Sequence, residues 1–437
     1  MIRRVTVQDM LMARDARAER QADFLGRHGL PLISFTMNIA GDIKVDDSIR
    51  RAYREGVRRI RRELERMHAP VAECAETTAF TGCEALWAAD ADAIALKARM
   101  QRIEEQDALG RLFDIDVIAA DGSHLSRENE RPCLICGGPV RACARSRRHT
   151  AEELFARTQE IIAAHFRGEF VCRTGEKAQQ ALLYEALTTP KPGLVDCRNT
   201  GAHRDMDLFS FAASASALRP YFENCVRIGL DGGSAEQLQH AGLLAEDAML
   251  AAASANTHKG AIFSLGILCC AIGQCGENAA LTDILSRAGA LGGYFLRQLE
   301  GNATPVTGGE KQYRDYGLTG ARGEAASGFP TVRRISLPTL EAALHAGKSL
   351  QEAGLVALLH LMAHVQDSNI IRRAGMDGQR WVHARARQLL EAGWDENDLR
   401  QLDDECIARH ISPGGSADLL AVTYFLHLIT REGSDTP

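Results

Sequence analysis

The character of the sequence changes near residue 150, and this change constrains the fold more than any other feature. Before it, short β-branched and apolar runs such as 32–39 and 113–118 alternate with helical segments, which predicts an α+β domain. After it, long helical segments rich in Ala, Leu, Glu and Arg are separated by glycine-rich loops, which predicts an all-α domain. We therefore expect a multidomain protein with an N-terminal domain over 1–167 and a C-terminal domain over 168–437, divided just after a helix over 151–166.

Composition and charge argue against several classes of protein. The net charge of −6 argues against a protein that coats nucleic acid or an anionic membrane, so we expect neither as a partner. The longest apolar stretch, 260–273, is shorter than the roughly 20 residues that a membrane-spanning helix needs. The 12 cysteines are too sparse for a disulfide scaffold, and the N-terminus lacks an apolar signal segment. We therefore expect a cytoplasmic protein without a membrane span.

An Asp-x-Asp pair provides the first candidate site. Side chains alternate along a strand, so Asp114 and Asp116 project from one face of the strand predicted over 113–118. Two carboxylates that converge in this way can hold Mg²⁺ and support an in-line displacement at an α-phosphorus, which indicates a nucleotidyltransferase-like domain. The nearby Arg111 could pair with phosphate. For the motif alone, an exposed strand face without function is the simpler alternative.

A predicted amphipathic helix over 48–67 carries eight arginines. These could hold phosphates. Arginines on a helix usually point toward water, however, and Glu55, Glu63 and Glu65 neutralise part of their charge. We therefore interpret this helix as having a solvated outer face.

Three cysteines and a histidine lie close together in the sequence. Cys133, Cys136, Cys143 and His149 have the ligand types, and one CxxC spacing, of a zinc site. The gaps of six and five residues between the later members fit less well, and no second CxxC pair accompanies them. We therefore favour reduced structural cysteines in a basic loop over zinc, with a redox role as a further alternative. The neighbouring arginines could receive the anionic part of a nucleotide.

The C-terminal domain carries five separate polar segments, which suggests loops that meet over a helical bundle. They are 191–207, 256–260, 308–330, 367–373 and 412–418. The helix that follows the second segment begins with N–H groups that attract phosphate. The third is dense in glycine, which fits a loop over the site or, equally, an ordinary long connection. Together the five segments imply a polyanionic ligand with a metal ion.

Two aspartates of the first segment, Asp205 and Asp207, stand at the start of the next helix and close to His203. For either aspartate alone, capping of the helix is the simpler interpretation, because carboxylates accept hydrogen bonds from the free N–H groups of a first turn. Two carboxylates beside an imidazole are more than a cap requires, so we keep them as catalytic candidates. For His258, capping and phosphate binding stay equally open.

Taken together, these segments resemble two enzyme families. The stretch 191–207, Asn256-Thr257-His258-Lys259-Gly260, Arg322-Gly323-Glu324, Asp367-Ser368-Asn369 and 412–418 resemble the triphosphoribosyl-dephospho-CoA synthase family, over nearly all of 167–437. Residues 34–39 with Lys44, 110–116 and 131–146 are similar to the apo-citrate lyase phosphoribosyl-dephospho-CoA transferase family. A chain with both parts looks like a fused bifunctional protein that makes and installs the prosthetic group of citrate lyase.

The resemblance implies two reactions, one in each domain. In the C-terminal domain, the 2′-hydroxyl of 3′-dephospho-CoA attacks C1′ of the ribose of ATP and expels adenine. In the N-terminal domain, a serine of the citrate lyase acyl carrier (gamma) subunit attacks the α-phosphorus of that product and releases pyrophosphate. Displacement at C1′ needs a carboxylate to balance charge, a base for the hydroxyl and help for the departing adenine.

The resemblance also implies roles for the candidate residues. In the N-terminal domain we expect Mg²⁺ on Asp114 and Asp116, with Arg111 facing phosphate. In the C-terminal domain we expect Mg²⁺ on Asp205 and Asp207, Glu324 as base or third ligand, and His203 with His258 to orient phosphate or move a proton. The expected substrate and phosphate contacts are Lys191, Asn256, His258, Lys259, Arg322, Gly414, Gly415 and Ser416.

Three alternatives remain at this stage. The equivalent prosthetic-group pathway of malonate decarboxylase uses a synthase that resembles the helical domain. A metal-dependent hydrolase of N-ribosyl bonds could use the same acids to activate water. A nucleic-acid adaptor could use the arginine-rich helix and the cysteine cluster, but the acidic net charge and the aromatic content of 5% argue against it.

Overall fold

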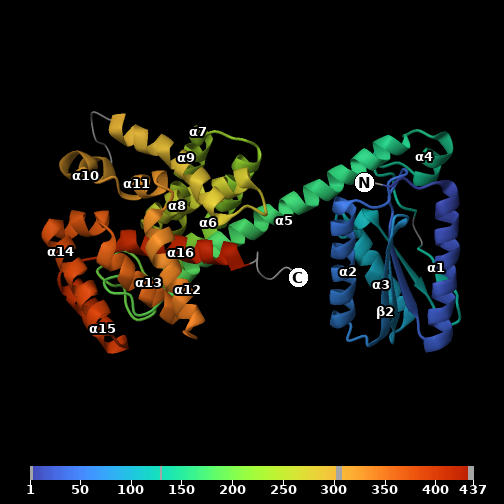
Figure 1. Ribbon diagram of the computed structural model, residues 1–437, viewed down its shortest axis with the longest axis horizontal. Coiled ribbons are helices and arrows are strands. Elements are labelled where there is room, and N and C mark those ends of the chain that lie inside the picture. Colours follow the sequence, from blue (N-terminus) through green and yellow to red (C-terminus); the bar gives the residue numbers. More distant parts are fainter. Residues whose placement is uncertain (1–2, 128–129, 302–307, 432–437) are drawn as a thin grey trace. The chain divides into compact units, whose positions relative to one another are not determined.

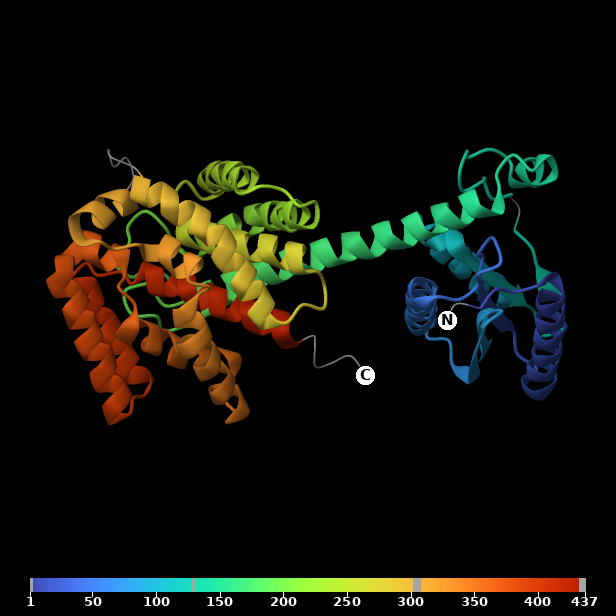
Figure 2. The ribbon, with the colours of Figure 1, turned by 45° about the horizontal axis from the view of Figure 1, so that its top comes forward.

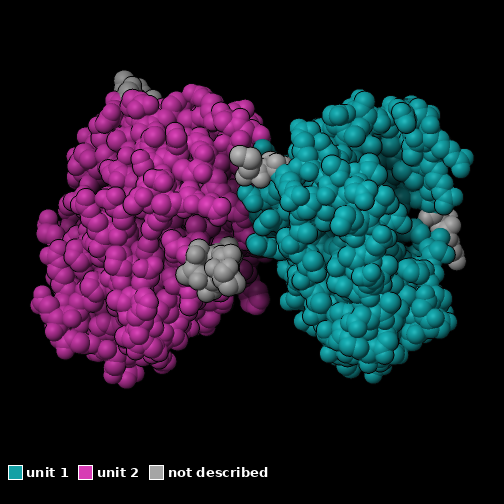
Figure 3. All heavy atoms as spheres, turned by 45° about the vertical axis from the view of Figure 1, so that its right-hand side comes forward, with its two compact units in different colours: residues 1–169 teal, residues 170–437 magenta. Residues whose placement is uncertain are grey.

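The computed structural model describes residues 3–127, 130–301 and 308–431. The chain forms two compact units, which we call unit 1 (residues 1–169) and unit 2 (residues 170–437), shown in different colours in Figure 3.

The division between the units falls inside one long helix, α5 (Ala151–Leu187). Figure 2 shows this helix as uninterrupted, so the predicted helix end after residue 166 is wrong. Gly168 lies at the predicted end. A glycine inside a helix costs only about 1 kcal/mol relative to alanine, and the good helix formers around it can offset that cost.

Unit 1 contains an antiparallel sheet with the strand order β2-β3-β1-β4-β5. Its strands are β1 (Leu32–Met37), β2 (Val71–Ala79), β3 (Gly82–Ala89), β4 (Phe113–Ile118) and β5 (His124–Leu125). The strand predicted over 113–118 coincides with β4, and the one predicted over 32–39 begins with β1 but ends at Met37. The predicted combination of helices with a sheet is therefore confirmed for unit 1.

Helices lie on both faces of this sheet (Figure 1). They are α1 (Val7–His28) on one face and α2 (Asp47–Arg66), α3 (Ala93–Glu105) and the first part of α5 on the other, with η1 (Gly110–Leu112) and α4 (Val140–Ser146) in the connections. The main core packs Ile33, Phe35, Trp87 and Ile115 against α2 and α3. Because side chains alternate along a strand, the intervening polar residues lie on the face that α1 partly covers.

The arginines of α2 are extensively paired with acids. Arg59 donates to both Glu55 and Asp107, and Arg61 donates to Glu76 on β2. These ion pairs support the interpretation of α2 as a charged outer face, although Arg59 itself is buried in the pairing.

Unit 2 is built from helices, as predicted. After α5 they are α6 (Leu208–Leu230), α7 (Ala235–Ala253), α8 (Lys259–Cys275), α9 (Leu281–Gly301), α10 (Gly308–Tyr316), α11 (Gly320–Ala326), the π-helical turn η2 (Val332–Ser336), α12 (Leu337–His345), α13 (Leu350–His364), α14 (Ser368–Ala392), α15 (Glu396–Ala408) and α16 (Gly414–Arg431). The apolar helix α8 lies in the core, where it packs against α6, α9 and α16.

The segment predicted as a glycine-rich loop over the site is mostly helical. It forms α10 and α11, so Arg322 and Glu324 lie on a helix rather than in a loop. The glycines allow close packing here: a Cβ on Gly292 of α9 would lie 2.5 Å from the backbone of Ala326. Within the described residues, no helix combines the length and the apolar character needed to cross a membrane.

Candidate active sites

The sheet of unit 1 places Asp114 and Asp116 on one face, which confirms the predicted alternation. Both residues are exposed, while their neighbours on β4 are buried on the opposite face. The register of β1 sets Thr36 opposite Asp114 and Ser34 opposite Asp116. Oxygen atoms from two adjacent strands therefore gather at one place on the sheet, and the second strand carries residues of the segment 34–39, on which the resemblance to the transferase family rests.

Basic side chains surround this acid pair. Desolvation and then the charge of Asp116 raise the pKa of Asp114, against the opposing charges of Arg131, Lys97 and Arg17. The carboxylates thus lie in a field that three cations from separate elements create. Such a field suits an anionic ligand that is held through a metal ion.

Two arginines connect the neighbouring segments to β4. Arg131 donates from Nη1 to the carbonyl of Phe113 at 2.7 Å and pairs with the buried Glu104. Arg111 donates from Nη2 to the carbonyl of Pro132 at 2.6 Å. The structure therefore places Arg111 in a local hydrogen bond, and its predicted contact with phosphate stays a prediction.

A third carboxylate shares this face of the sheet. Glu84 on β3 stands opposite Thr36, so it belongs to the same row as Asp114. It is buried and accepts hydrogen bonds from Arg17 and Arg20, each at 2.6 Å. Because two arginines already neutralise it, Glu84 anchors α1 to the sheet rather than completing the acid pair.

Unit 2 contains a cavity of about 950 Å³. All five polar segments of the sequence contribute to it, which confirms the prediction that they meet. Its lining includes Lys191, His203, Asp205, Asn256, His258, Lys259, Glu324, Arg372, Arg373, Gly414, Gly415 and Asp418. This volume lies in the upper part of the range for small-molecule sites, about 300–1,000 Å³.

The carboxylate of Asp418 lies against the start of α8. It accepts a hydrogen bond from the backbone of Ala261, and a Cβ added to Gly260 would lie 2.0 Å from its Oδ2 atom. Only glycine therefore permits this approach. Desolvation raises the pKa of Asp418 well above its usual value, and the charges of Glu185 and Asp367 add to the effect.

His258 presents one ring nitrogen without a protein partner. Its Nδ1 atom lies 2.7 Å from Oγ of Ser214, while the buried Nε2 atom has no hydrogen-bond partner among the described residues. Burial lowers the pKa of His258 to about 3, and the charge of Lys191 contributes. The imidazole is therefore neutral near pH 7 and can form a hydrogen bond with a ligand in the cavity.

His203 is held in a single tautomer. Arg373 donates to its Nδ1 atom at 3.2 Å, and because a guanidinium can only donate, Nε2 carries the proton and donates to Oγ of Ser412 at 2.8 Å. Burial and the charge of Arg373 lower the pKa of His203. The exposed Asp205 lies 3.8 Å from the same ring.

Lys191 lines the cavity but has a structural partner, so its predicted phosphate contact stays a prediction. Its ammonium group is buried, donates to the carbonyl of Glu185 at 2.7 Å and pairs with the side chain of Glu185. Burial raises the pKa of Glu185 in spite of this pair. Glu185 was missed by the sequence analysis because it stands within the regular helical pattern of α5, where nothing marks it out.

Asp207 is the N-cap of α6. Its Oδ1 atom accepts a hydrogen bond from the backbone of Ser210 at 2.8 Å, and these bonds lower its pKa. Asp205 lines the cavity, but Asp207 does not. The predicted metal pair is therefore corrected: the simpler interpretation, a cap, describes Asp207.

The start of α16 is occupied by a carboxylate of the protein itself. The buried Asp367 accepts from the backbone of Ser416 at 2.8 Å and from that of Gly415, and it also caps α14. These N–H groups are therefore satisfied internally, contrary to the predicted phosphate contacts at Gly415 and Ser416. Gly414 and Gly415 still line the cavity with their backbone.

The two residues predicted from α11 have different surroundings. Glu324 lines the cavity and accepts hydrogen bonds from the backbone and hydroxyl of Thr331, at 2.8 and 3.0 Å. Burial nevertheless raises its pKa. Arg322 does not line the cavity and lies 3.8 Å from the buried Glu310, contrary to the predicted phosphate contact.

The basic residues that line the cavity include two that were not predicted as phosphate contacts. Arg372 and Arg373 of α14 line it together with Lys191 and Lys259, and Lys259 pairs with Glu246 at 2.5 Å. Asn256 lines it and is exposed. The signal for the arginine pair was present in the sequence, because both follow Asp367-Ser368-Asn369 within one helical turn.

The cysteine cluster of unit 1 comes together in space. The ligand atoms of Cys133, Cys136, Cys143 and His149 all lie within 4.8 Å of one another. In the described part of the chain, these four residues form the one group of at least three histidine, cysteine or acidic side chains that lie close enough together to hold a metal ion.

Comparison with known proteins relates both units to established families. Residues 172–436 match CitG, described as ATP:dephospho-CoA triphosphoribosyl transferase, and residues 5–165 match CitX, described as apo-citrate lyase phosphoribosyl-dephospho-CoA transferase. The Haemophilus influenzae protein named Protein CitXG is 32% identical over 97% of this chain and 96% of its own length.

Relatives of the second part alone are also similar. A 2-(5′′-triphosphoribosyl)-3′-dephosphocoenzyme-A synthase of Pectobacterium atrosepticum is 43% identical over 58% of this chain and 87% of its own. The synthase of Haemophilus ducreyi is 37% identical over 68% of this chain and 99% of its own.

One polar site in each unit, and one transferase family for each unit, define a bifunctional transferase. More specifically, the chain belongs to the ATP:dephospho-CoA triphosphoribosyl transferase family, fused to an N-terminal domain of the apo-citrate lyase phosphoribosyl-dephospho-CoA transferase family. It makes 2′-(5′′-triphosphoribosyl)-3′-dephospho-CoA from ATP and 3′-dephospho-CoA with release of adenine. It then transfers the phosphoribosyl-dephospho-CoA group to apo-citrate lyase with release of pyrophosphate.

Proposed function

We propose that the two reactions occur at two separate sites, synthesis in the cavity of unit 2 and transfer at the acid pair of unit 1. The observation that carries this assignment is the convergence of all five polar segments of unit 2 on one cavity. The cavity offers the carboxylates, the imidazoles and the guanidinium groups that a reaction between two phosphorylated nucleotides requires. The following roles belong to this proposal.

In the cavity, the 2′-hydroxyl oxygen of dephospho-CoA forms a bond to C1′ of ATP while the bond from C1′ to adenine breaks. The hydroxyl proton passes to a base, and the departing adenine takes up a proton. We assign the base to Asp418, because its desolvated carboxylate has a raised pKa and its side chain lines the cavity. Glu324 is less suited, since Thr331 already donates to both of its oxygens.

The neutral imidazole of His258 serves as a hydrogen-bonding group toward the substrates. Its buried Nε2 atom has no partner among the described residues, so a bound ligand can supply one. His203 has a different task, because Arg373 and Ser412 fix both of its nitrogens. We therefore propose that His203 holds Arg373 in place, while Arg373 and Arg372 contact phosphate.

Magnesium fits this cavity through Asp205. Mg²⁺ is often held by one or two carboxylates together with substrate phosphates, and Asp205 presents an exposed carboxylate at the lining. When bound, the ion would mask the negative charge of the triphosphate. Asp207 is not part of this proposal, because its carboxylate caps α6.

In unit 1 we propose nucleotidyltransferase-type chemistry at Asp114 and Asp116. A serine oxygen of the citrate lyase acyl carrier subunit forms a bond to the α-phosphorus, and the bond from that phosphorus to pyrophosphate breaks. The two exposed carboxylates, with Thr36 and Ser34 beside them, form an oxygen-rich set that fits Mg²⁺, which would neutralise the phosphates. Arg131 supplies positive charge at the same place.

The experiment separates the two steps. The full chain is incubated with ATP, 3′-dephospho-CoA and Mg²⁺, and adenine release is measured by chromatography; acyl carrier subunit is then added and weighed by mass spectrometry. We expect adenine without the carrier, and a carrier heavier by one phosphoribosyl-dephospho-CoA group afterwards. Failure to release adenine without the carrier would contradict separate sites.

We also propose that the protein acts in the cytoplasm, where ATP is available.

A further inference from the structure

The segment around Cys133 folds into a tight knuckle. The backbone N–H of Cys133 donates to the carbonyl of Gly138 at 2.7 Å, and that of Gly137 donates back to the carbonyl of Cys133 at 3.0 Å. Gly137 has a φ of 68°, which glycine adopts without strain. This turn brings Cys136 alongside Cys133, as in sites where a CxxC pair supplies two metal ligands.

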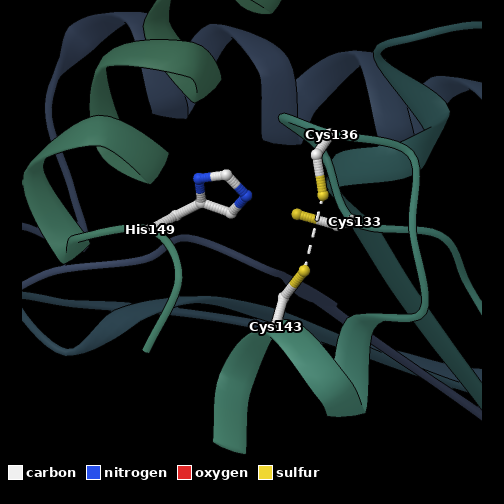
Figure 4. Close-up of side chains that lie close together, drawn as sticks. All are labelled: Cys133, Cys136, Cys143 and His149. Atoms are coloured by element: carbon white, nitrogen blue, oxygen red, sulfur yellow. Dashed lines mark hydrogen bonds between the residues drawn. The ribbon is translucent and has the colours of Figure 1, made fainter. Parts of the chain in front are cut away.

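The other two members reach the knuckle from α4. Cys143 stands in the first turn of this helix, and Arg147 ends it with a φ of 49°. The chain then turns back, since the N–H of Arg148 donates to the carbonyl of Cys143 at 3.1 Å. This reversal points His149 toward the three sulfur atoms (Figure 4). The gaps of six and five residues are therefore spanned by one short helix and its reversal.

The spacing of the ligand atoms suits a tetrahedral ion. The Sγ atoms of Cys136 and Cys143 are 3.4 Å apart, and all four ligand atoms lie within 4.8 Å of one another. In a tetrahedral site with Zn–S bonds of about 2.3 Å, the sulfur atoms stand about 3.8 Å apart. Four ligands from three sulfurs and one imidazole also match the composition of structural zinc sites.

A second observation points to a missing ligand. The Nε2 atom of His149 is buried and has no hydrogen-bond partner among the described residues. A disulfide between Cys136 and Cys143 would leave this nitrogen and the thiol of Cys133 unexplained. A metal ion accounts for all four side chains at once. The surrounding basic residues, including Arg145 and Arg148, suit a centre with three thiolates, whose net charge with Zn²⁺ is negative.

We propose that Cys133, Cys136, Cys143 and His149 bind one structural zinc ion. The ion closes the loop that begins directly after Pro132. Just before this loop, Arg131 donates to the carbonyl of Phe113 on β4, and the carbonyl of Pro132 accepts from Arg111. Zinc therefore fixes the backbone that carries Arg131 beside the acid pair. This positioning role of the metal rests on the proposed function of unit 1, whereas the zinc site itself does not.

Metal content tests the site without reference to activity. The full chain is expressed without a polyhistidine tag in medium supplemented with zinc, desalted under reducing conditions, and analysed for metal. We expect about one zinc ion per chain, and we expect loss of this zinc in Cys136→Ser and in His149→Gln. Cys74→Ser is the matched control, because Cys74 is an exposed thiol of unit 1 outside the cluster, and it should keep the ion.

Cobalt reconstitution adds a spectroscopic readout. Chain loaded with Co²⁺ should show thiolate-to-cobalt charge-transfer absorption and the strong visible bands of tetrahedral cobalt, both absent from Cys136→Ser. Zinc content in the unaltered chain no higher than in Cys136→Ser would overturn the site. Loss of two reactive thiols without bound metal, the mark of a Cys136–Cys143 disulfide, would overturn it as well.

The positioning role needs a separate assay. Preformed triphosphoribosyl-dephospho-CoA is supplied with the carrier, and labelling is compared between the unaltered chain and His149→Gln. We expect labelling to fall at least about tenfold, while adenine release by unit 2 stays unchanged. Equal labelling by a zinc-free variant would overturn the positioning role and leave the site standing. If the zinc-loaded, unaltered chain labels no carrier, the proposed function of unit 1 fails instead.

Discussion

The acids of the two units differ in their surroundings. In unit 1, Asp114 and Asp116 are exposed on a sheet. In unit 2, Asp418, Glu324 and Glu185 all line a cavity, where the first two are partly buried and Glu185 is buried.

This difference matches the substrates of the two reactions. Transfer to a serine of another protein requires a site that a folded carrier can approach. Displacement at C1′ of ATP passes through an oxocarbenium-like state that water would attack, so the reacting groups benefit from enclosure. In the assignment that we propose, one chain combines an exposed acid pair, which we call the open site, with partly buried acids around a cavity, which we call the enclosed site, and each suits its acceptor.

The largest expected effect comes from the open site. Asp116→Ala should lower carrier labelling from preformed intermediate by about 10³-fold, since the loss of a metal ligand removes several kcal/mol of transition-state stabilisation. Adenine release should not change. Glu65→Ala, which removes an exposed acid on α2, is the control and should leave both activities intact. Parallel loss of both activities in Asp116→Ala would mean that the sites are not separate.

The next effect concerns the enclosed site. Asp418→Asn keeps the shape of the side chain but removes the proposed base, so adenine release should fall by about 10²-fold or more. Labelling from preformed intermediate should be retained, and an unchanged helical circular-dichroism spectrum should show that unit 2 of the variant is folded. Normal adenine release would exclude Asp418 as the base.

Enclosure also predicts a dependence of stability on pH. Burial lowers the pKa of His258 to about 3, below the ordinary value of 6.5, so the unfolded chain binds a proton that the folded chain does not. The contribution of the neutral His258 to the free energy of unfolding is fully present above pH 6.5. It declines as pH falls below that value, by about 1.4 kcal/mol per pH unit. Hydrogen exchange of α8, corrected for its intrinsic pH dependence, should show this decline in the unaltered chain and a smaller one in His258→Gln. Equal slopes would contradict a neutral, buried imidazole.

The smallest effect separates two neighbouring aspartates. Asp207→Ala should cost about 1 kcal/mol of stability, because it removes the cap of α6, and it should leave adenine release nearly unchanged. Asp205→Ala removes the proposed ligand of Mg²⁺ and should weaken the magnesium dependence of the reaction. A strong loss of activity in Asp207→Ala would restore the predicted metal pair.

Local periodicity explains what the sequence could predict. The alternation of β4 located Asp114 and Asp116 because the two-residue period of a strand is set by the backbone alone. The composition of the C-terminal part likewise predicted that unit 2 is helical. The polar segments predicted the lining of the cavity because loops at helix starts gather polar side chains.

Internal pairing of polar groups explains what the sequence could not predict. The partner of Lys191 is a helix residue, Glu185, and the N–H groups of α16 are taken by Asp367 from another helix start. No spacing reveals such internal pairs. The cysteine gaps looked unsuitable because the reversal at Arg147, which brings His149 back, depends on a single left-handed residue.

Complementation between two inactive chains tests the central claim most directly. Asp418→Asn supplies only the open site and Asp116→Ala only the enclosed one, and the two are mixed with ATP, 3′-dephospho-CoA, Mg²⁺ and acyl carrier subunit. Two separate sites predict that the mixture labels the carrier, through the released intermediate, while each variant alone does not. No labelling by the mixture, with both chains folded, would contradict the account.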